Sequence, residues 1–292
     1  MVKIEKLTLQ KHINYSSELH FTGGQITRDG DLLLIERNVN EEELDPFDRP
    51  VLKRDWTIRI IKNEKIKTVQ LTNVPLIPEH IDLFSDGTLL IVQARCLKDG
   101  EYAERNARRY NMNGQLIEAF TLGDGIENMQ IDGKDTIWVN YFDEGIFGNF
   151  GWEQTMGRDG LVAYTINGDK LWGAREYDII DGCALNVVDS SEIYFYYYDD
   201  YFLVQLDNMK EKNRYRMEGH HWLNQFLFAQ GNLIAQMDMN KLTRFKIRNQ
   251  TITKGEGLEL VDEHGKHIAG PVFLRGKFLY VYGRKGIYKR EF

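Results

Sequence analysis

The chain has 292 residues, of which 42% are hydrophobic and 28% charged, and its formal net charge is −7. A chain of this size buries most of its unfolded surface, and no linker rich in proline, glycine or serine divides it. The one short basic cluster is Arg105, Arg108 and Arg109, so we expect neither a nucleic acid nor a membrane as a partner.

The N-terminus, MVKIEKLTLQ, lacks the apolar stretch of a signal peptide. No segment approaches the roughly 18 apolar residues of a membrane span. The two cysteines, Cys96 and Cys183, fit a reducing compartment, although they would also be able to pair if the fold brought them together. We therefore expect a cytoplasmic protein.

A hairpin pattern recurs six times along the chain. In each copy an apolar run meets a turn, mostly with Asp, Gly or Ser, and a strongly β-prone run follows. The copies are QITRDGDLLLIER from Gln25, IDLFSDGTLLIVQA from Ile81, MQIDGKDTIWVNY from Met129, LNVVDSSEIYFYYY from Leu185, QFLFAQGNLIAQM from Gln225 and PVFLRGKFLYVYG from Pro271. The first apolar residues after the turns stand 40 to 57 residues apart, at Leu32, Leu89, Ile137, Ile193, Leu233 and Phe278.

This period is close to that of β-propeller blades, in which neighbouring four-stranded sheets cover each other's faces and a closed ring protects the edges. We therefore predict an all-β fold, a six-bladed β-propeller, with a plain sandwich as the alternative. The last copy ends after a third strand, GIYKREF from Gly286, and residues 3–10 are predicted to supply the fourth strand and close the ring. The chain is then a single domain, residues 1–292, with blades at approximately 12–72, 73–122, 123–177, 178–217, 218–260 and 261–292 plus 3–10.

The connections between the second and third strands are long in the first three predicted blades and short in the last three. The long ones are NVNEEELDPFDRPVLKRD after Arg37, CLKDGEYAERNA after Arg95 and FDEGIFGNFGWEQTMGRDG after Tyr141. Insertions on one face of a repeat protein often build a binding site, although they are also tolerated as decoration. Phe150 and Trp152 in the third loop are candidates to stack on a ring or sugar, and a loop packed on itself is the alternative.

A ring of small and polar residues is predicted at the top of the central channel. Nine residues before the six apolar positions stand Gly23, His80, Asn128, Ala184, Asn224 and Ala269. Six residues before them stand only apolar residues, which we expect to pack between blades: Ile26, Leu83, Ile131, Val187, Leu227 and Val272. Asn224, together with His220 and His267, is a candidate to bind a ligand.

Carboxylate and amide side chains near this ring are candidate metal ligands: Glu79, Asp82, Glu127, Asn128 and Asn186. Oxygen ligands suit a divalent cation such as Ca²⁺, Mg²⁺ or Mn²⁺. The alternative is a channel whose polar groups hold ordered water and cap strand ends. His80 and His221 are candidate catalytic groups, because histidine can transfer protons near neutral pH.

Familiar nucleophile and zinc signatures are absent from the sequence, which contains no Walker A, G-x-S-x-G, H-E-x-x-H, EF-hand or C-x-x-C pattern. The segment GIENMQIDGKDTIWV from Gly125 resembles the repeat of six-bladed propellers in the NHL and gluconolactonase/regucalcin superfamily. YFDEGIFGNFGW from Tyr141 and GLVAYTINGDKLW from Gly160 more specifically resemble a set of uncharacterised bacterial propeller-like proteins, which carry no known activity.

The resemblance to gluconolactonases implies a divalent cation at the channel mouth, held by a glutamate, two asparagines and an aspartate. Glu79 or Glu127, with Asn128, Asn186 and Asp82, approximates that set, whereas the E-G-P and N-G-L motifs of those enzymes are not found here.

These features together predict a protein that binds a small molecule at the top of its channel. In one version of this hypothesis it hydrolyses a lactone or ester with the help of a divalent cation. The alternative is a non-catalytic scaffold whose long loops bind a protein or a carbohydrate. A third interpretation is a solvated channel rim on a scaffold.

Overall fold

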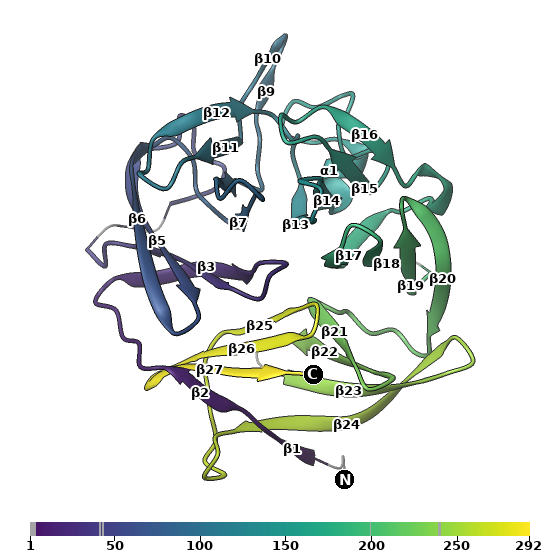
Figure 1. Ribbon diagram of the computed structural model, residues 1–292. Helices are drawn as coiled ribbons and strands as arrows, with labels where there is room; N and C mark the ends of the chain where they lie inside the picture. The colour runs from purple at the N-terminus through teal and green to yellow at the C-terminus, as the bar shows by residue number, and fades with distance from the viewer. Residues whose placement is uncertain (1–3, 41, 43, 199, 239–240) are drawn as a thin grey trace.

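The computed structural model describes residues 4–40, 42, 44–198, 200–238 and 241–292. Its strands form small, mostly antiparallel sheets that stand in a ring (Figure 1). The prediction of an all-β, propeller-like fold is therefore confirmed. Among the residues described, no helix has the length and apolar character needed to cross a membrane.

The repeated hairpins form with their turns at the predicted places. The second strand of each hairpin begins at, or one residue before, the apolar position identified from the sequence, as at Leu32 and Phe278. The turn residue Gly30 has a φ of 83°, and a Cβ atom on it would lie 2.5 Å from the ring of Phe278. Glycine is required there both by the backbone conformation and by the close approach of the last hairpin.

Three four-stranded antiparallel sheets come from the first 173 residues. The first contains β3 (His20–Ile26), β4 (Leu32–Arg37), β5 (Arg54–Lys62) and β6 (Lys65–Val74). The second contains β7 (His80–Leu83), β8 (Leu89–Val92), β11 (Ala107–Tyr110) and β12 (Leu116–Phe120). The third contains β13 (Ile126–Ile131), β14 (Ile137–Tyr141), β15 (Leu161–Tyr164) and β16 (Lys170–Gly173).

A nine-stranded sheet follows, and it contains two antiparallel four-stranded units. The first unit is β17 (Asp181–Asp189), β18 (Glu192–Tyr198), β19 (Phe202–Asp207) and β20 (Lys210–Met217). The second is β21 (Gln225–Ala229), β22 (Asn232–Asp238), β23 (Lys241–Arg248) and β24 (Thr251–Val261). The units join where β20 runs parallel to β24, and this pairing covers only Arg216 with Thr251 and Met217 with Ile252.

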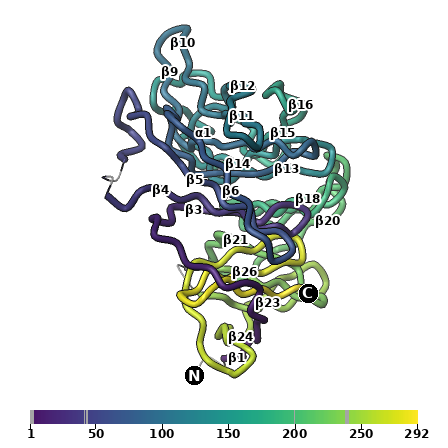
Figure 2. The backbone as a smooth tube through the Cα atoms, turned by 60° about the vertical axis from the view of Figure 1, so that its left-hand side comes forward, coloured from purple at the N-terminus to yellow at the C-terminus, as the bar shows by residue number. Residues whose placement is uncertain are grey.

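The last sheet contains β25 (Val272–Arg275), β26 (Phe278–Gly283), β27 (Gly286–Glu291) and a strand from the N-terminus, β2 (Gln10–Ile13). The N-terminus thus completes this sheet through β2, which shares only Gln10 with the predicted segment 3–10. Most of the described part of that segment forms a separate strand, β1 (Ile4–Thr8), which pairs parallel with β24 (Figures 1 and 2).

The extra strand has a clear physical cause. Leu7 and Leu9 are 2% and 0% exposed and pack in the core between β24 and the last sheet. Their burial holds this N-terminal segment against both neighbouring sheets. Glu5 also accepts two hydrogen bonds from Arg244 of β23, at 2.9 and 3.0 Å, which fix β1 at the edge of the nine-stranded sheet.

The remaining short elements lie in connections between strands. The second sheet is interrupted by the hairpin of β9 (Lys98–Asp99) and β10 (Tyr102–Ala103), which projects outward in Figure 1. The helix α1 (Asp143–Phe147) follows β14, and a 3₁₀ turn at Arg175–Tyr177 precedes β17.

The first strand of every four-stranded unit lies toward the centre of the ring (Figure 1). Each inner strand contacts the next, in the order β3, β7, β13, β17, β21 and β25. The series is closed, because β25 also contacts β3. Most residues predicted to pack between blades are buried, including Ile26, Ile131 and Val187. The core therefore lies between adjacent sheets.

The two cysteines are both free and buried. Burial raises the pKa of the Cys96 thiol and that of the Cys183 thiol. Neither thiol is therefore suited to act as a nucleophile.

Candidate functional site

A pocket of 260 Å³ lies at the centre of the ring, between the inner strands. We call it the channel pocket. Its lining comes from all six inner strands and the residue before β21: Gly24, Gln25, Ile26, His80, Glu127, Asn128, Gln130, Leu185, Asn224, Gln225, Phe273 and Leu274. His80, Asn128 and Asn224 of the polar ring thus lie together, as does the candidate cation ligand Glu127.

A belt of polar side chains joins each inner strand to the next around the ring. We call it the polar belt; its members are Gln25, Asp82, Gln130, Asn186, Gln225 and Arg275. Five of these side chains donate a hydrogen bond to a carbonyl oxygen of the next strand: Gln25 to Ile81 (3.0 Å), Gln130 to Leu185 (3.1 Å), Asn186 to Phe226 (3.0 Å), Gln225 to Val272 (3.2 Å) and Arg275 to Ile26 (2.9 Å). The sixth, Asp82, instead accepts a hydrogen bond from the backbone amide of Ile131 at 2.7 Å. Because the three glutamines also line the channel pocket, the belt forms its inner end.

Arg275 lies at the centre of the polar belt and is 1% exposed. Its guanidinium pairs with Asp82 at 2.7 Å and also donates to the carbonyl oxygens of Val187 at 3.0 Å and Ile131 at 2.6 Å. One side chain therefore ties its own strand to four other inner strands. Arg275 was not among the candidates identified from the sequence. One sequence signal would have indicated the polar belt: a glutamine stands near the start of every second hairpin, at Gln25, Gln130 and Gln225.

Two predicted metal ligands, Asp82 and Asn186, belong to the polar belt. Asp82 is paired with Arg275, and Asn186 accepts from the amide of Gly276 at 2.9 Å as well as donating to Phe226. A third, Glu79, accepts from the amide of Ala94 at 2.7 Å and lines a separate pocket of 490 Å³ beside β3. The five predicted cation ligands are therefore not gathered at one point.

Glu127, which lines the channel pocket, and Asp181 both have raised pKa values. Burial, followed by the charge of Asp181, raises the pKa of Glu127 to about 7. Burial, followed by the charge of Asp143, raises the pKa of Asp181 to about 6. Asp181 therefore ionises first, and its charge then opposes the ionisation of Glu127. Asp181 precedes the hairpin repeat in its blade, so repeat positions could not single it out.

His80 is held as a neutral ring. Burial lowers its pKa to about 4, and its Nε2 atom lies 3.2 Å from the carbonyl oxygen of Ile126. Because a carbonyl only accepts, Nε2 carries the hydrogen in this contact. At neutral pH the group thus positions β7 against β13.

The other candidate histidines lie outside the lining of the channel pocket. The ring of His221 packs on Phe245 with centroids 5.7 Å apart, and burial lowers its pKa. His220 packs on Tyr201 at 5.0 Å. His267 lies 3.7 Å from Glu259 of β24, on the outer part of its sheet.

The three long loops pack on one another. Trp152 is 7% exposed, and its Nε1 donates to the carbonyl oxygen of Cys96 at 2.6 Å, so it fastens the third loop to the second. Phe150 lies under the guanidinium of Arg49 at 4.8 Å and contacts Phe47 of the first loop. Of the two interpretations of these aromatic residues, the structure agrees with a self-packed loop for Trp152.

Replacing Trp152 with phenylalanine is expected to lower the free energy of unfolding by about 1–2 kcal/mol, because the carbonyl of Cys96 then loses its partner. Chemical denaturation monitored by circular dichroism measures the change. The matched control is Phe147→Ala in the same loop, at a side chain that is 67% exposed, where we expect less than about 0.5 kcal/mol. Equal stability of W152F and the wild type would contradict a structural role for the indole.

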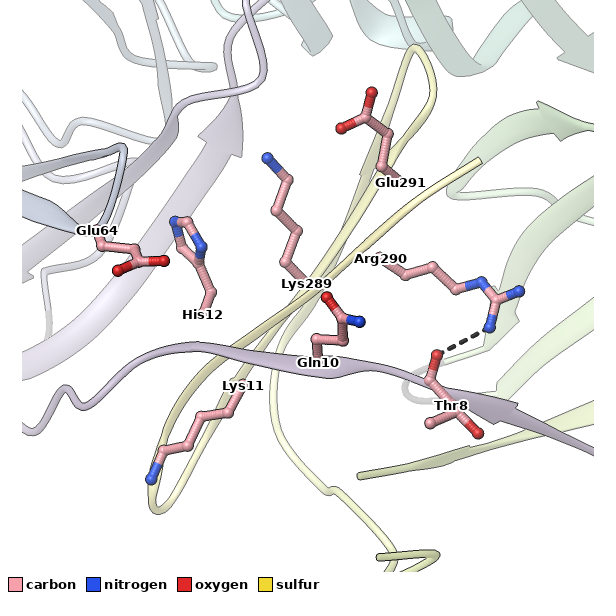
Figure 3. A pocket seen from close by; sticks show the side chains of 8 residues that line it. All are labelled: Thr8, Gln10, Lys11, His12, Glu64, Lys289, Arg290 and Glu291. Atoms are coloured by element: carbon pink, nitrogen blue, oxygen red, sulfur yellow. Dashed lines mark hydrogen bonds between the residues drawn. The ribbon is translucent and has the colours of Figure 1, made fainter. Parts of the chain in front are cut away.

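A further hollow, of 420 Å³, lies where β2 meets β27 (Figure 3). It is larger than the channel pocket, but two of its charged side chains already contact neighbouring strands. Arg290 donates to the carbonyl oxygen of Thr8 at 2.8 Å, and Lys289 lies over the rings of Phe278 and Tyr280 at 4.7 and 5.2 Å. We therefore take the channel pocket as the candidate site.

Comparison with protein families matches residues 156–290, slightly less than half of the chain, to the model of the YxzG family. The matching model is thus not that of NHL repeats. A comparison with curated proteins gives no significant match.

Solved structures of the same fold include virginiamycin B lyase from Staphylococcus aureus, with a TM-score of 0.52, 11% identity and coverage of 97% of this chain and 98% of that one. The β-propeller domain of Cps50 (Swd1) from Myceliophteria thermophila has a TM-score of 0.53 at 9% identity, over 95% of this chain and 85% of that one. At these identities the likeness concerns the fold alone.

Proposed function

We propose that this chain binds a small polar molecule in the channel pocket of a six-bladed β-propeller. Two observations support the blade number: the closed series of inner strands, and the short parallel contact that makes two four-stranded units appear as one nine-stranded sheet. Each unit is then one blade, with β1 as an added edge strand.

The observation that carries the binding proposal is a set of polar side chains with spare hydrogen-bonding capacity in the channel pocket. Among the described contacts, neither the carboxylate of Glu127 nor the side-chain amide of Asn224 bonds to another protein group. In contrast, every member of the polar belt beneath them makes a side-chain hydrogen bond to another inner strand. Concave sites with a few free polar groups are typical of ligand binding, and 260 Å³ is slightly below the usual range of about 300–1,000 Å³, which favours a small ligand.

The geometry favours binding over the two other hypotheses. Hydrolysis with His80 and His221 as proton carriers is less well supported, because His80 is neutral and bonded to Ile126 while His221 lies outside the pocket lining. Recognition of a carbohydrate or protein through Trp152 is also less well supported, because the indole is buried.

A panel of small hydroxy acids, sugars and lactones, tested in EDTA by thermal shift and by calorimetry, examines the proposal. We expect at least one compound to raise the melting temperature of the wild type, and Asn224→Leu to weaken its binding by tenfold or more, because leucine removes an amide and fills space in the pocket.

The discriminating control is Phe150→Ala, which changes the long loops and leaves the channel pocket intact. Binding that is lost in F150A and retained in N224L would assign the ligand to the loops and contradict the proposal. So would a panel in which no compound stabilises the wild type.

A further inference from the structure

The fold divides the basic cluster found in the sequence. Arg109 forms an ion pair with Asp86, whereas Arg105 and Arg108 line a pocket of 210 Å³ that Arg109 does not line. Lys53 of the first long loop is a third cation in this lining. We call this site the basic pocket. Its three cations come from the first long loop, the second long loop and β11, so the fold gathers positive charge there in a chain whose net charge is −7.

The basic pocket lies beside the connection from the first four-stranded sheet to the second. Pro75 and Leu76 of this connection, which joins β6 to β7, form part of its wall. Pro50 and Val51 of the first long loop and Tyr102 of β10, in the hairpin that projects outward in Figure 1, also line it. The pocket therefore combines cationic side chains with a largely apolar wall.

No carboxylate compensates the three cations, since none of them forms an ion pair with any residue that the structure describes. The acidic side chain in the lining, Glu104, is already engaged through both oxygens. One forms an ion pair with Arg49 at 2.6 Å, and the other accepts from the backbone amide of Leu97 at 2.8 Å. Like charges gathered in one pocket repel one another, so an anion bound there is favoured.

Arg108 supplies a second and independent sign of a missing partner. Its Nε atom is buried and makes no hydrogen bond to a described residue, which is unfavourable for a donor. Its guanidinium hydrogen-bonds to the hydroxyl of Tyr110, a neutral group that leaves the charge uncompensated.

The neutral polar side chains of the basic pocket, in contrast, are already bonded. The side-chain amide of Gln93 accepts from the backbone of Ile77 at 2.7 Å and donates to that of Arg95 at 2.8 Å. Asn106 donates to two carbonyl oxygens and accepts from the amide of Leu122 at 3.0 Å. The unused hydrogen-bonding capacity of the basic pocket therefore belongs to its cations.

We propose that the basic pocket binds the phosphate group of a small phosphate monoester. Such a group carries a charge of about −1.5 to −2 near pH 7 and offers three acceptor oxygens, whereas a carboxylate offers a single charge. Arginine binds phosphate oxygens through two parallel hydrogen bonds, and the lining contains two arginines. Because 210 Å³ is below the usual range of about 300–1,000 Å³, the organic part of the ligand is small and packs on the apolar wall.

Isothermal titration calorimetry with glycerol 3-phosphate, at pH 7.5 in Tris chloride buffer, tests the inference. Glycerol is titrated in parallel as the ligand without its phosphate. The variants are Arg105→Gln and Arg108→Gln, each of which removes one cation from the basic pocket. The matched control is Arg109→Gln, which removes the same charge from the next residue of β11 but outside the lining.

We expect saturable binding of glycerol 3-phosphate to the wild type and no binding of glycerol. The affinity should fall tenfold or more in R105Q and R108Q and change less than twofold in R109Q. Arg105 is exposed, so R105Q keeps the fold, and far-UV circular dichroism verifies this for each variant. No saturable binding to the wild type, or equal affinities of R105Q and R109Q, would overturn the inference.

The basic pocket shares no lining residue with the channel pocket, so this inference does not rest on the proposed function. The variant N224L is therefore expected to bind glycerol 3-phosphate as the wild type does. Binding that is lost in N224L and retained in R105Q would assign the phosphate to the channel pocket and contradict the inference.

Discussion

Replacing Arg275 with methionine is expected to lower the free energy of unfolding by about 3–5 kcal/mol, the largest loss we predict for a single substitution. The guanidinium pairs with Asp82, and both side chains are 1% exposed. Methionine retains much of the volume but leaves the carboxylate of Asp82 buried without its cation. It also removes the bonds to the carbonyl oxygens of Ile26, Ile131 and Val187. Chemical denaturation gives the change directly.

The double variant R275M/D82N separates the charge effect from a packing effect. Asparagine removes the uncompensated charge, so the double variant should be clearly more stable than the sum of the two single changes predicts. The control is Lys277→Met, which breaks an ion pair with Glu291 whose side chains are 58% and 50% exposed, and should cost less than about 1 kcal/mol. Additive losses in the double variant would show that Arg275 and Asp82 do not act as a pair.

Replacing Glu127 with glutamine is expected to make the protein more stable at pH 8 in EDTA, by on the order of 3 kcal/mol. The pKa of Glu127 rises from 4.5 to about 7 on folding, so the folded state favours the protonated carboxyl. As the pH rises from about 4.5 to about 7, the unfolded chain loses this proton first, and the wild type loses stability. Glutamine cannot ionise and escapes this loss.

The test compares free energies of unfolding of wild type and E127Q between pH 4.5 and pH 8. The two proteins should be similar at the acidic end and diverge as the pH rises. Glu153→Gln, which removes an exposed carboxylate in the third long loop, is the control and should follow the wild type. A wild type that gains stability relative to E127Q on raising the pH would contradict the assignment.

The hairpins were predictable because turn chemistry and alternating apolar residues act over a few positions. The first strand positions of β4, β8, β14 and β26 coincide with the apolar residues that follow each turn. The same local patterns could not show whether the N-terminus forms one strand or two. Leu7 and Leu9 fit either arrangement, and the choice depends on β24 and β27, more than 240 residues away in the chain.

The candidate site was predicted in part for the same reason. His80, Asn128 and Asn224 occupy equivalent repeat positions and meet at the channel pocket, since repeat position translates into height along the channel. Asp82 and Asn186 stand two residues further along their strands and belong to the polar belt instead. Trp152 was a plausible ligand platform from composition alone, and its burial depends on a contact with Cys96 in another loop.

The sequence by itself therefore determined the all-β class, the repeated hairpins and the set of polar residues at the channel mouth, because these follow from patterns within a few residues. Only the tertiary structure decided which polar side chains bond to other protein groups and which do not. Arg275 neutralises Asp82 across 193 residues, whereas burial and the like charge of Asp181 raise the pKa of Glu127. Charge compensation in a buried site depends on distances between side chains, and those exist only once the ring has closed.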